Sequence, residues 1–173
     1  MAGPVASVLL DIIPSKNGLK EIEDIIQKIS DKVEEEDFWI IDTKFIDGTV
    51  EIKEGRPFGI KKKKIDLEFD YSQEEILWIK KYANFNPVFN IEVFAMCNRE
   101  IDHRILGELT FYLAEKFNGL VDFEGQLEQS DDIEGKKWEI PYRTIDNEIK
   151  FYNITDIVFM KNWLENNNFR MLK

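Results

Sequence analysis

Residues 88–123 read VFNIEVFAMCNREIDHRILGELTFYLAEKFNGLVDF, and this stretch decides the fold. The apolar run at 88–96 predicts a strand. Residues 102–117 place apolar side chains three and four positions apart, which predicts a helix, and Asn118–Gly119 is a typical stop signal. The apolar run at 120–123 predicts a second strand. The middle of the chain is therefore predicted as strand, helix and strand.

Similar patterns flank this stretch on both sides. Before it, apolar periodicity predicts helices at 19–33 and 72–83 and strands at 5–13, 38–46, 49–53 and 65–70. After it, the patterns predict strands at 138–142 and 169–172 and a helix at 155–166. Asp47–Gly48 is a hairpin signal, and Pro141 places its strand at a sheet edge. This mixture predicts the α+β class, a mainly antiparallel sheet with helices packed on it.

The predicted order contains two overlapping βαββαβ patterns, which share the strand at 88–96. Two ferredoxin-like units, in halves 1–96 and 88–173, are one arrangement of this order. The helices after Ser72 and Thr155 share a faint similarity, and either a duplication or chance likeness of two amphipathic helices explains it. At 173 residues the chain fits a single α+β domain over 1–173.

Composition and charge limit the function classes. The chain has 34 acidic and 23 basic residues, a net charge of −11, which argues against nucleic acid and anionic membranes and permits a basic partner. Its 43% hydrophobic residues rule out a disordered chain. One Cys and one His are too few for a zinc site, and no cofactor motif is present, so we expect neither metal nor cofactor.

The chain start carries no signal-peptide pattern. It lacks a basic segment, and Asp11 interrupts the first apolar run. No stretch approaches the roughly 18 apolar residues that span a bilayer. We therefore expect a cytoplasmic protein.

Two acidic segments are candidate partner-binding sites. A helix end disfavours negative charge, so four acids after the first predicted helix indicate either a solvated end or a surface kept acidic for a partner. The polar segment 124–137 offers the same two alternatives, solvated loop or partner contact. The candidate residues are Glu34, Glu35, Glu36, Asp37, Asp131 and Asp132.

A third candidate lies where the central strand meets the central helix. Cys97 and His103 invite a thiol–imidazole hypothesis, with Asp102 and Arg104 nearby. No orienting group or oxyanion loop accompanies them, and a core thiol beside ordinary helix-start residues is the plainer interpretation. The basic run Lys61–Lys64 indicates a charged strand edge that blocks aggregation, or a phosphate contact.

Several stretches resemble one family of small acidic bacterial proteins of unassigned function. They are residues 97–109 and 113–123, the start Met1–Pro4 and the end Phe169–Lys173. Members of this family look like the immunity proteins of polymorphic toxin systems. The resemblance implies no catalytic residue.

The function that this resemblance implies is a cytoplasmic, non-enzymatic immunity protein. It would bind and neutralise a cognate, basic toxin through an acidic surface, with the six acids above as steering charges. One alternative is a small enzyme or ligand-binding domain with a pocket near Cys97, His103 and Arg104. Another is an assembly subunit that uses an exposed strand edge.

Overall fold

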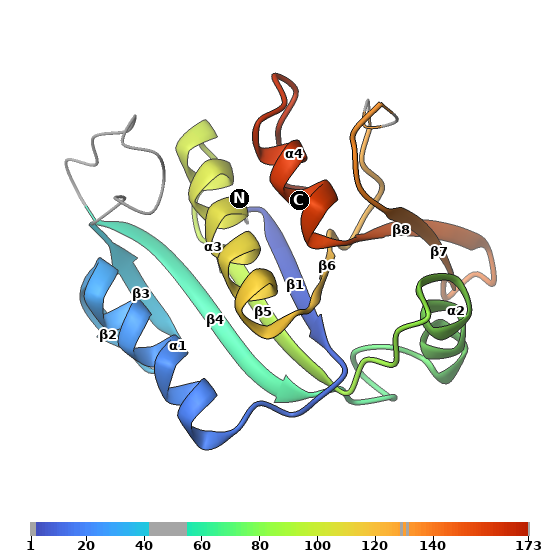
Figure 1. Cartoon of the computed structure of the whole chain (residues 1–173), viewed down its shortest axis with the longest axis horizontal. Coiled ribbons are helices and arrows are strands. Elements are labelled where there is room, and N and C mark those ends of the chain that lie inside the picture. The colour runs from blue at the N-terminus through green and yellow to red at the C-terminus, as the bar shows by residue number, and fades with distance from the viewer. Residues whose placement is uncertain (1–2, 42–54, 129, 131, 173) are drawn as a thin grey trace.

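The computed structural model describes residues 3–41, 55–128, 130 and 132–172, and it has the predicted α+β class (Figure 1). The predicted turn at 47–48 and strand at 49–53 lie outside the described residues. The described helices are α1 (Lys16–Ile29), α2 (Gln73–Ala83), α3 (Glu100–Phe117) and α4 (Ile157–Leu164). The described strands are β1 (Val5–Leu10), β2 (Ser30–Glu34), β3 (Asp37–Ile40), β4 (Arg56–Lys64), β5 (Phe89–Ala95), β6 (Leu120–Asp122), β7 (Lys137–Arg143) and β8 (Ile149–Thr155).

All eight described strands form one sheet in the order β2-β3-β4-β5-β1-β6-β8-β7. Every pair of neighbours is antiparallel. β5 and β1 lie in the middle, while β2 and β7 close the order at its two ends. β7 contains Pro141, so the prediction that this strand lies at an edge is confirmed. The overlapping ferredoxin-like units are not confirmed.

Three helices cover one face of the sheet (Figure 1). α1, α3 and α4 bury apolar side chains against strand residues such as Val8, Ile91 and Val121, which form the main core. On the opposite face, Ile79 of α2 packs with Leu9 and the other apolar side chains of the second core. Because neighbouring side chains along a strand point to opposite faces, β1 contributes to both cores.

Local signals set the start of α2 and the end of α3 as predicted. The Ser72 hydroxyl accepts the Glu75 N–H at 3.2 Å, and the Glu75 carboxylate accepts the Ser72 N–H at 2.9 Å, a reciprocal capping box. α3 ends at Phe117, and the φ of 53° at the next residue, Asn118, is the left-handed conformation that stops a helix. None of the described helices combines the length and the apolar character needed to cross a membrane.

Three predicted elements are wrong: the extent of the first helix and the strands at 65–70 and 169–172. In the segment 65–70, local hydrogen bonds compete with the predicted strand. The apolar periodicity extends the first helix to Val33, but the helix ends at Ile29 and Val33 belongs to β2. The alternating segment 65–70 forms no strand and contains a turn instead. There the Asp66 carboxylate accepts the Glu68 N–H at 2.8 Å, and the Asp70 carboxylate accepts the Asp66 N–H at 2.9 Å.

Three further observations concern the basic run, a strand that was not predicted and the segment 169–172. The basic run Lys61–Lys64 pairs with β5, whereas the pairing of β4 with β3 reaches only Gly59. The other side of the run therefore has no strand partner among the described residues, in agreement with the charged-edge interpretation. No sequence pattern predicts β8, although it pairs along its whole length with β7. Residues 169–172 form no strand; the Leu172 carbonyl accepts the Val5 N–H at 3.2 Å.

Candidate functional site

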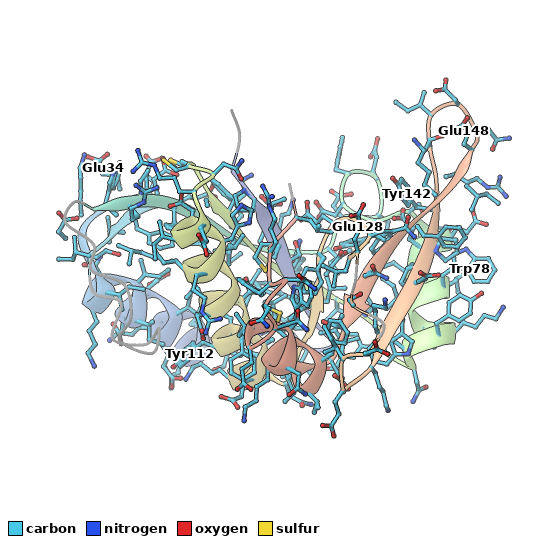
Figure 2. All side chains as sticks on the ribbon, turned by 90° about the horizontal axis from the view of Figure 1, so that it is seen from above. Glu34, Trp78, Tyr112, Glu128, Tyr142 and Glu148 are labelled. Carbon is cyan, nitrogen blue, oxygen red and sulfur yellow. The ribbon has the colours of Figure 1, made fainter. Side chains whose placement is uncertain are left out.

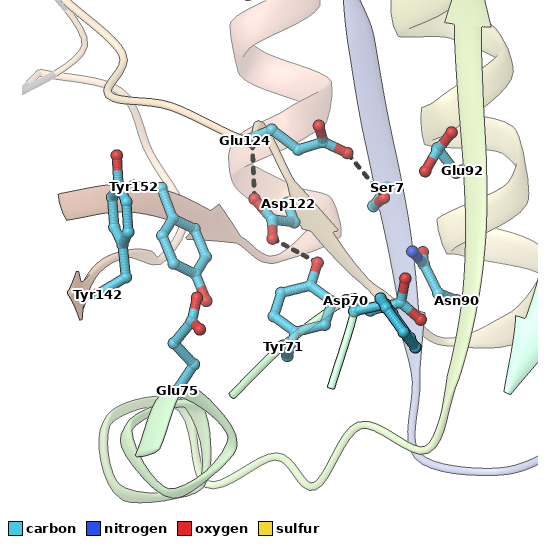
Figure 3. A pocket seen from close by; sticks show the side chains of 11 residues that line it. Ser7, Asp70, Tyr71, Glu75, Asn90, Glu92, Asp122, Glu124, Tyr142 and Tyr152 are labelled. Carbon is cyan, nitrogen blue, oxygen red and sulfur yellow. Dashed lines mark hydrogen bonds between the residues drawn. The ribbon is translucent and has the colours of Figure 1, made fainter. Parts of the chain in front are cut away.

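A cavity of about 340 Å³ lies between the start of α2 and the face of the sheet that α1, α3 and α4 leave free (Figure 3). We call it the α2 pocket. Five strands and the segment that enters α2 contribute to its walls. Its lining residues are Ser7, Phe69, Asp70, Tyr71, Glu75, Asn90, Glu92, Asp122, Glu124, Tyr142 and Tyr152.

The strand register places the floor of the α2 pocket. Ser7 of β1 pairs with Glu92 of β5 on one side and with Asp122 of β6 on the other. Side chains directly opposite in an antiparallel ladder share a face and lie close together. The register therefore aligns two carboxylates on either side of one hydroxyl, although these three residues lie far apart in the sequence.

A chain of hydrogen bonds crosses this floor (Figure 3). The Tyr71 hydroxyl donates to Asp122 Oδ2 at 2.7 Å, and the Glu124 N–H donates to Asp122 Oδ1 at 2.7 Å. The Ser7 hydroxyl donates to Glu124 Oε1 at 3.1 Å. These bonds join the segment before α2 to β6 and β1, so they fix the carboxylates in place.

Desolvation disfavours the ionised forms of Asp122, Glu124 and Tyr71. Desolvation raises the pKa of Asp122 to about 7, although the hydrogen bonds from Tyr71 and from the Glu124 amide oppose the shift. Desolvation likewise raises the pKa of Glu124. It raises the pKa of Tyr71 well above its ordinary value, and the Asp122 charge adds to that shift. Asp122 and Tyr71 are therefore shielded from water, and a charge placed near them has a strong effect on their ionisation.

Two lysines of β4 neutralise part of the α2 pocket. Lys61 Nζ lies 3.0 Å from Glu92 Oε1, and Lys63 pairs with Asp70. In the described ranges, no ion pair involves Glu75, Asp122 or Glu124, the other three carboxylates of the pocket. The pocket therefore keeps an excess of negative charge and of hydrogen-bond acceptors.

Two buried polar atoms in the same walls lack a hydrogen-bond partner within the described residues. Asn90 is 3% exposed, and its Oδ1 accepts no hydrogen bond there. Tyr152 is 5% exposed, its hydroxyl has no partner, and it points toward the Glu75 carboxylate (Figure 3). Buried polar groups are nearly always satisfied in native proteins, so each of these two atoms requires an explanation.

The acidic segments predicted from the sequence lie apart from each other. Glu34, Glu35 and Glu36 are exposed and Asp37 is half-buried, where β2 turns into β3 at one end of the strand order. Asp132 is exposed in the connection between β6 and β7, and Asp131 lies outside the described residues. Figure 2 shows Glu34 and Glu128, one from each region, well separated across the sheet. The two segments therefore do not form one continuous patch.

The residues of the alternative pocket make structural contacts. His103 is 4% exposed, and its Nε2 lies 2.9 Å from Asn98 Oδ1. The Arg104 guanidinium pairs with Glu108 and donates to the Leu164 carbonyl, which joins α3 to the end of α4. A cavity of about 650 Å³ beside Arg104 is lined by Arg99, Phe169 and their neighbours, without Cys97 or His103.

The described residues were compared with the side-chain groupings that bind metal ions. No group of three or more His, Cys, Asp or Glu side chains there is arranged to hold a metal ion.

Sequence patterns do not reveal the α2 pocket. One signal is available: Asp122 stands inside the otherwise apolar run 120–123, and a carboxylate in a buried strand needs a local reason. Its partner Tyr71 lies 51 positions away, and only the folded chain brings them together.

Comparison with known proteins gives a match at the level of the family. A family model described as "Family of unknown function (DUF6368)" matches residues 2–173. No curated protein and no solved structure matches the chain.

Proposed function

The chain belongs to the family of unknown function DUF6368, and we propose that it is a binding protein that captures and neutralises a basic protein toxin. The observation that carries this proposal is the α2 pocket, where five carboxylates and two paired lysines meet on the sheet face opposite α1, α3 and α4. Such a surface attracts a cationic partner and repels anionic ones. The resemblance to immunity proteins suggests that the partner is a toxin.

The net charge of −11 supports the same partner class. An acidic protein raises the local concentration of a basic partner and speeds its association. Glu34, Glu35, Glu36 and Asp37 form one acidic group that would act in this long-range step, and the exposed Asp132 would act from another part of the surface. The α2 pocket would supply the short-range contacts.

The test first looks for the toxin gene that the proposal predicts beside the gene of this protein, and then co-expresses the toxin domain with the full chain. We expect the full chain to restore growth to cells that produce the active toxin domain, and to form a stable complex with a catalytically inactive toxin variant. Growth arrest despite abundant soluble protein, with no complex in size-exclusion chromatography, would overturn the proposal. An unrelated acidic protein of similar charge serves as the control for non-specific attraction.

A further inference from the structure

We propose that the α2 pocket is a guanidinium site, which receives an arginine side chain of the bound protein. This inference rests on the proposed function and specifies the chemistry of its contact. It follows from three features of the pocket: surplus carboxylates, buried acceptors without donors, and aromatic walls.

The surplus carboxylates give the pocket its charge preference. Lys61 and Lys63 satisfy Glu92 and Asp70, whereas Glu75, Asp122 and Glu124 accept hydrogen bonds only from neutral groups in the described structure. A carboxylate held in a poorly hydrated site forms a much stronger bond with a charged donor than with a neutral one. A cationic side chain would therefore supply the charged donor that Glu75, Asp122 and Glu124 do not have in the described structure.

The buried atoms without partners in the described structure indicate that a donor-rich group would fit. Asn90 Oδ1 can only accept, and the Tyr152 hydroxyl faces a carboxylate with no bond formed. They come from β5 and β8, on opposite sides of Asp122 in the strand order. Acceptors that approach from several directions match the five N–H donors of a guanidinium better than the three donors of an ammonium.

The aromatic walls favour the same group. Tyr71, Tyr142 and Tyr152 line the pocket together with Phe69. Tyr142 and Tyr152 form a tilted ring pair with centroids 5.8 Å apart. A planar guanidinium stacks on such faces and keeps its edge free for hydrogen bonds, whereas an ammonium prefers full hydration. A cavity of about 340 Å³ also exceeds what one ion needs.

The test uses small probes and requires no toxin. The full chain is titrated with N-acetyl-arginine methylamide and, separately, with N-acetyl-lysine methylamide, while backbone amide shifts are followed by NMR. We expect the arginine probe to move amides around Asp122, Glu124 and Tyr152 in a saturable manner, with at least fivefold higher affinity than the lysine probe. Equal affinities, or shifts that map elsewhere, would overturn the assignment.

Variants localise the effect. Tyr152→Phe removes the hydroxyl without a partner and keeps the ring, so the fold should persist while arginine affinity drops severalfold. Glu124→Gln should act in the same direction. Glu148→Gln removes an exposed acid from the β7–β8 turn and should leave affinity unchanged. Undiminished binding to both folded pocket variants would contradict the proposal.

The two proposals fail in distinguishable ways. Loss of probe binding with toxin neutralisation intact would remove the guanidinium site and leave the immunity function. Arginine binding at the α2 pocket, together with no rescue from the toxin, would support the guanidinium site and remove the immunity function.

Discussion

The hydroxyl of Tyr71 donates a 2.7 Å hydrogen bond to the fully buried carboxylate of Asp122. The bond ties the segment that enters α2 to β6, a strand of the sheet interior. Glu75 belongs to the first turn of α2, so this tie also positions one wall of the α2 pocket. Removing the hydroxyl tests whether the tie stabilises the fold.

Tyr71→Phe should lower the free energy of unfolding by about 1–3 kcal/mol, because a buried acceptor loses its donor. The loss should be larger at pH 8 than at pH 5, since the ionised Asp122 depends more on that donor. Urea denaturation at both pH values measures it. Tyr142→Phe is the matched control, because no hydrogen bond of its hydroxyl is described. Equal effects of the two substitutions would contradict the role of the bond.

Stability should fall as the pH rises toward neutrality. The pKa of Asp122 is raised to about 7 in the folded protein, against 3.8 as the ordinary value. Between these values the folded state binds more protons than the unfolded state, so rising pH favours unfolding, by up to about 1.4 kcal/mol per pH unit for one group. Glu124, whose pKa is also raised, acts in the same direction.

Asp122→Asn should flatten this pH dependence. The amide is neutral throughout and still offers an oxygen to the Glu124 N–H. Urea titrations at pH 4, 5.5, 7 and 8 compare the variant with the natural protein and with Asp132→Asn, an exposed control. If the Asp122→Asn variant kept the natural slope, another group would have to cause it.

The ion pair between Arg56 and Asp102 should be a strong stabilising contact. Two guanidinium nitrogens reach the carboxylate, at 2.8 and 2.6 Å, and the Asp102 side chain is fully buried. Arg56→Met would leave that charge with only the Arg99 N–H donor described for it, at a cost of about 3–5 kcal/mol. Thermal and urea unfolding measure the loss.

The matched control is the exposed pair of Lys32 and Glu34, whose side chains are each more than half exposed. Lys32→Met should change the free energy of unfolding by no more than about 1 kcal/mol, because water screens the pair. Similar losses at Arg56 and Lys32 would show that burial does not set the strength of these pairs.

Local signals in the sequence predict the ends of α2 and α3 well, because they act over a few residues. Ser72 with Glu75, and Asn118 with Gly119, satisfy or end the helix backbone wherever the helix lies. The strand predicted at 65–70 is wrong because the alternating pattern does not show that the carboxylates of Asp66 and Asp70 accept hydrogen bonds from nearby backbone amides. Side-chain hydrogen bonds of this kind compete with strand pairing.

The α2 pocket cannot be predicted in the same way, since no local pattern carries it. Its floor joins β1, β5 and β6, and it depends on a strand order in which β1 lies between the other two. The role of Lys61 in the basic run likewise depends on the neighbouring strand β5, where Glu92 lies opposite Lys61 and forms an ion pair with it. The candidate site thus requires long-range pairing that periodicity does not report.

The exposed acids and the pocket acids should affect different steps of binding to the neighbouring toxin. Neutralising Glu34, Glu35 and Glu36 together should slow association severalfold at low salt and leave dissociation almost unchanged, because these exposed charges act at long range. Glu124→Gln should instead speed dissociation, since it removes a short-range contact that the bound partner covers. Surface plasmon resonance between 50 and 500 mM salt measures both rates.

Salt supplies the internal control for that comparison. At 500 mM the Debye length is shorter than about 8 Å, so the association rates of the natural protein and the triple variant should converge. The faster dissociation of the Glu124→Gln variant should persist at every salt concentration, because a contact that the bound toxin covers is screened little. A natural association rate that does not change with salt would refute steering by the exposed acids, and unchanged dissociation of the Glu124→Gln variant would place the toxin contact outside the α2 pocket.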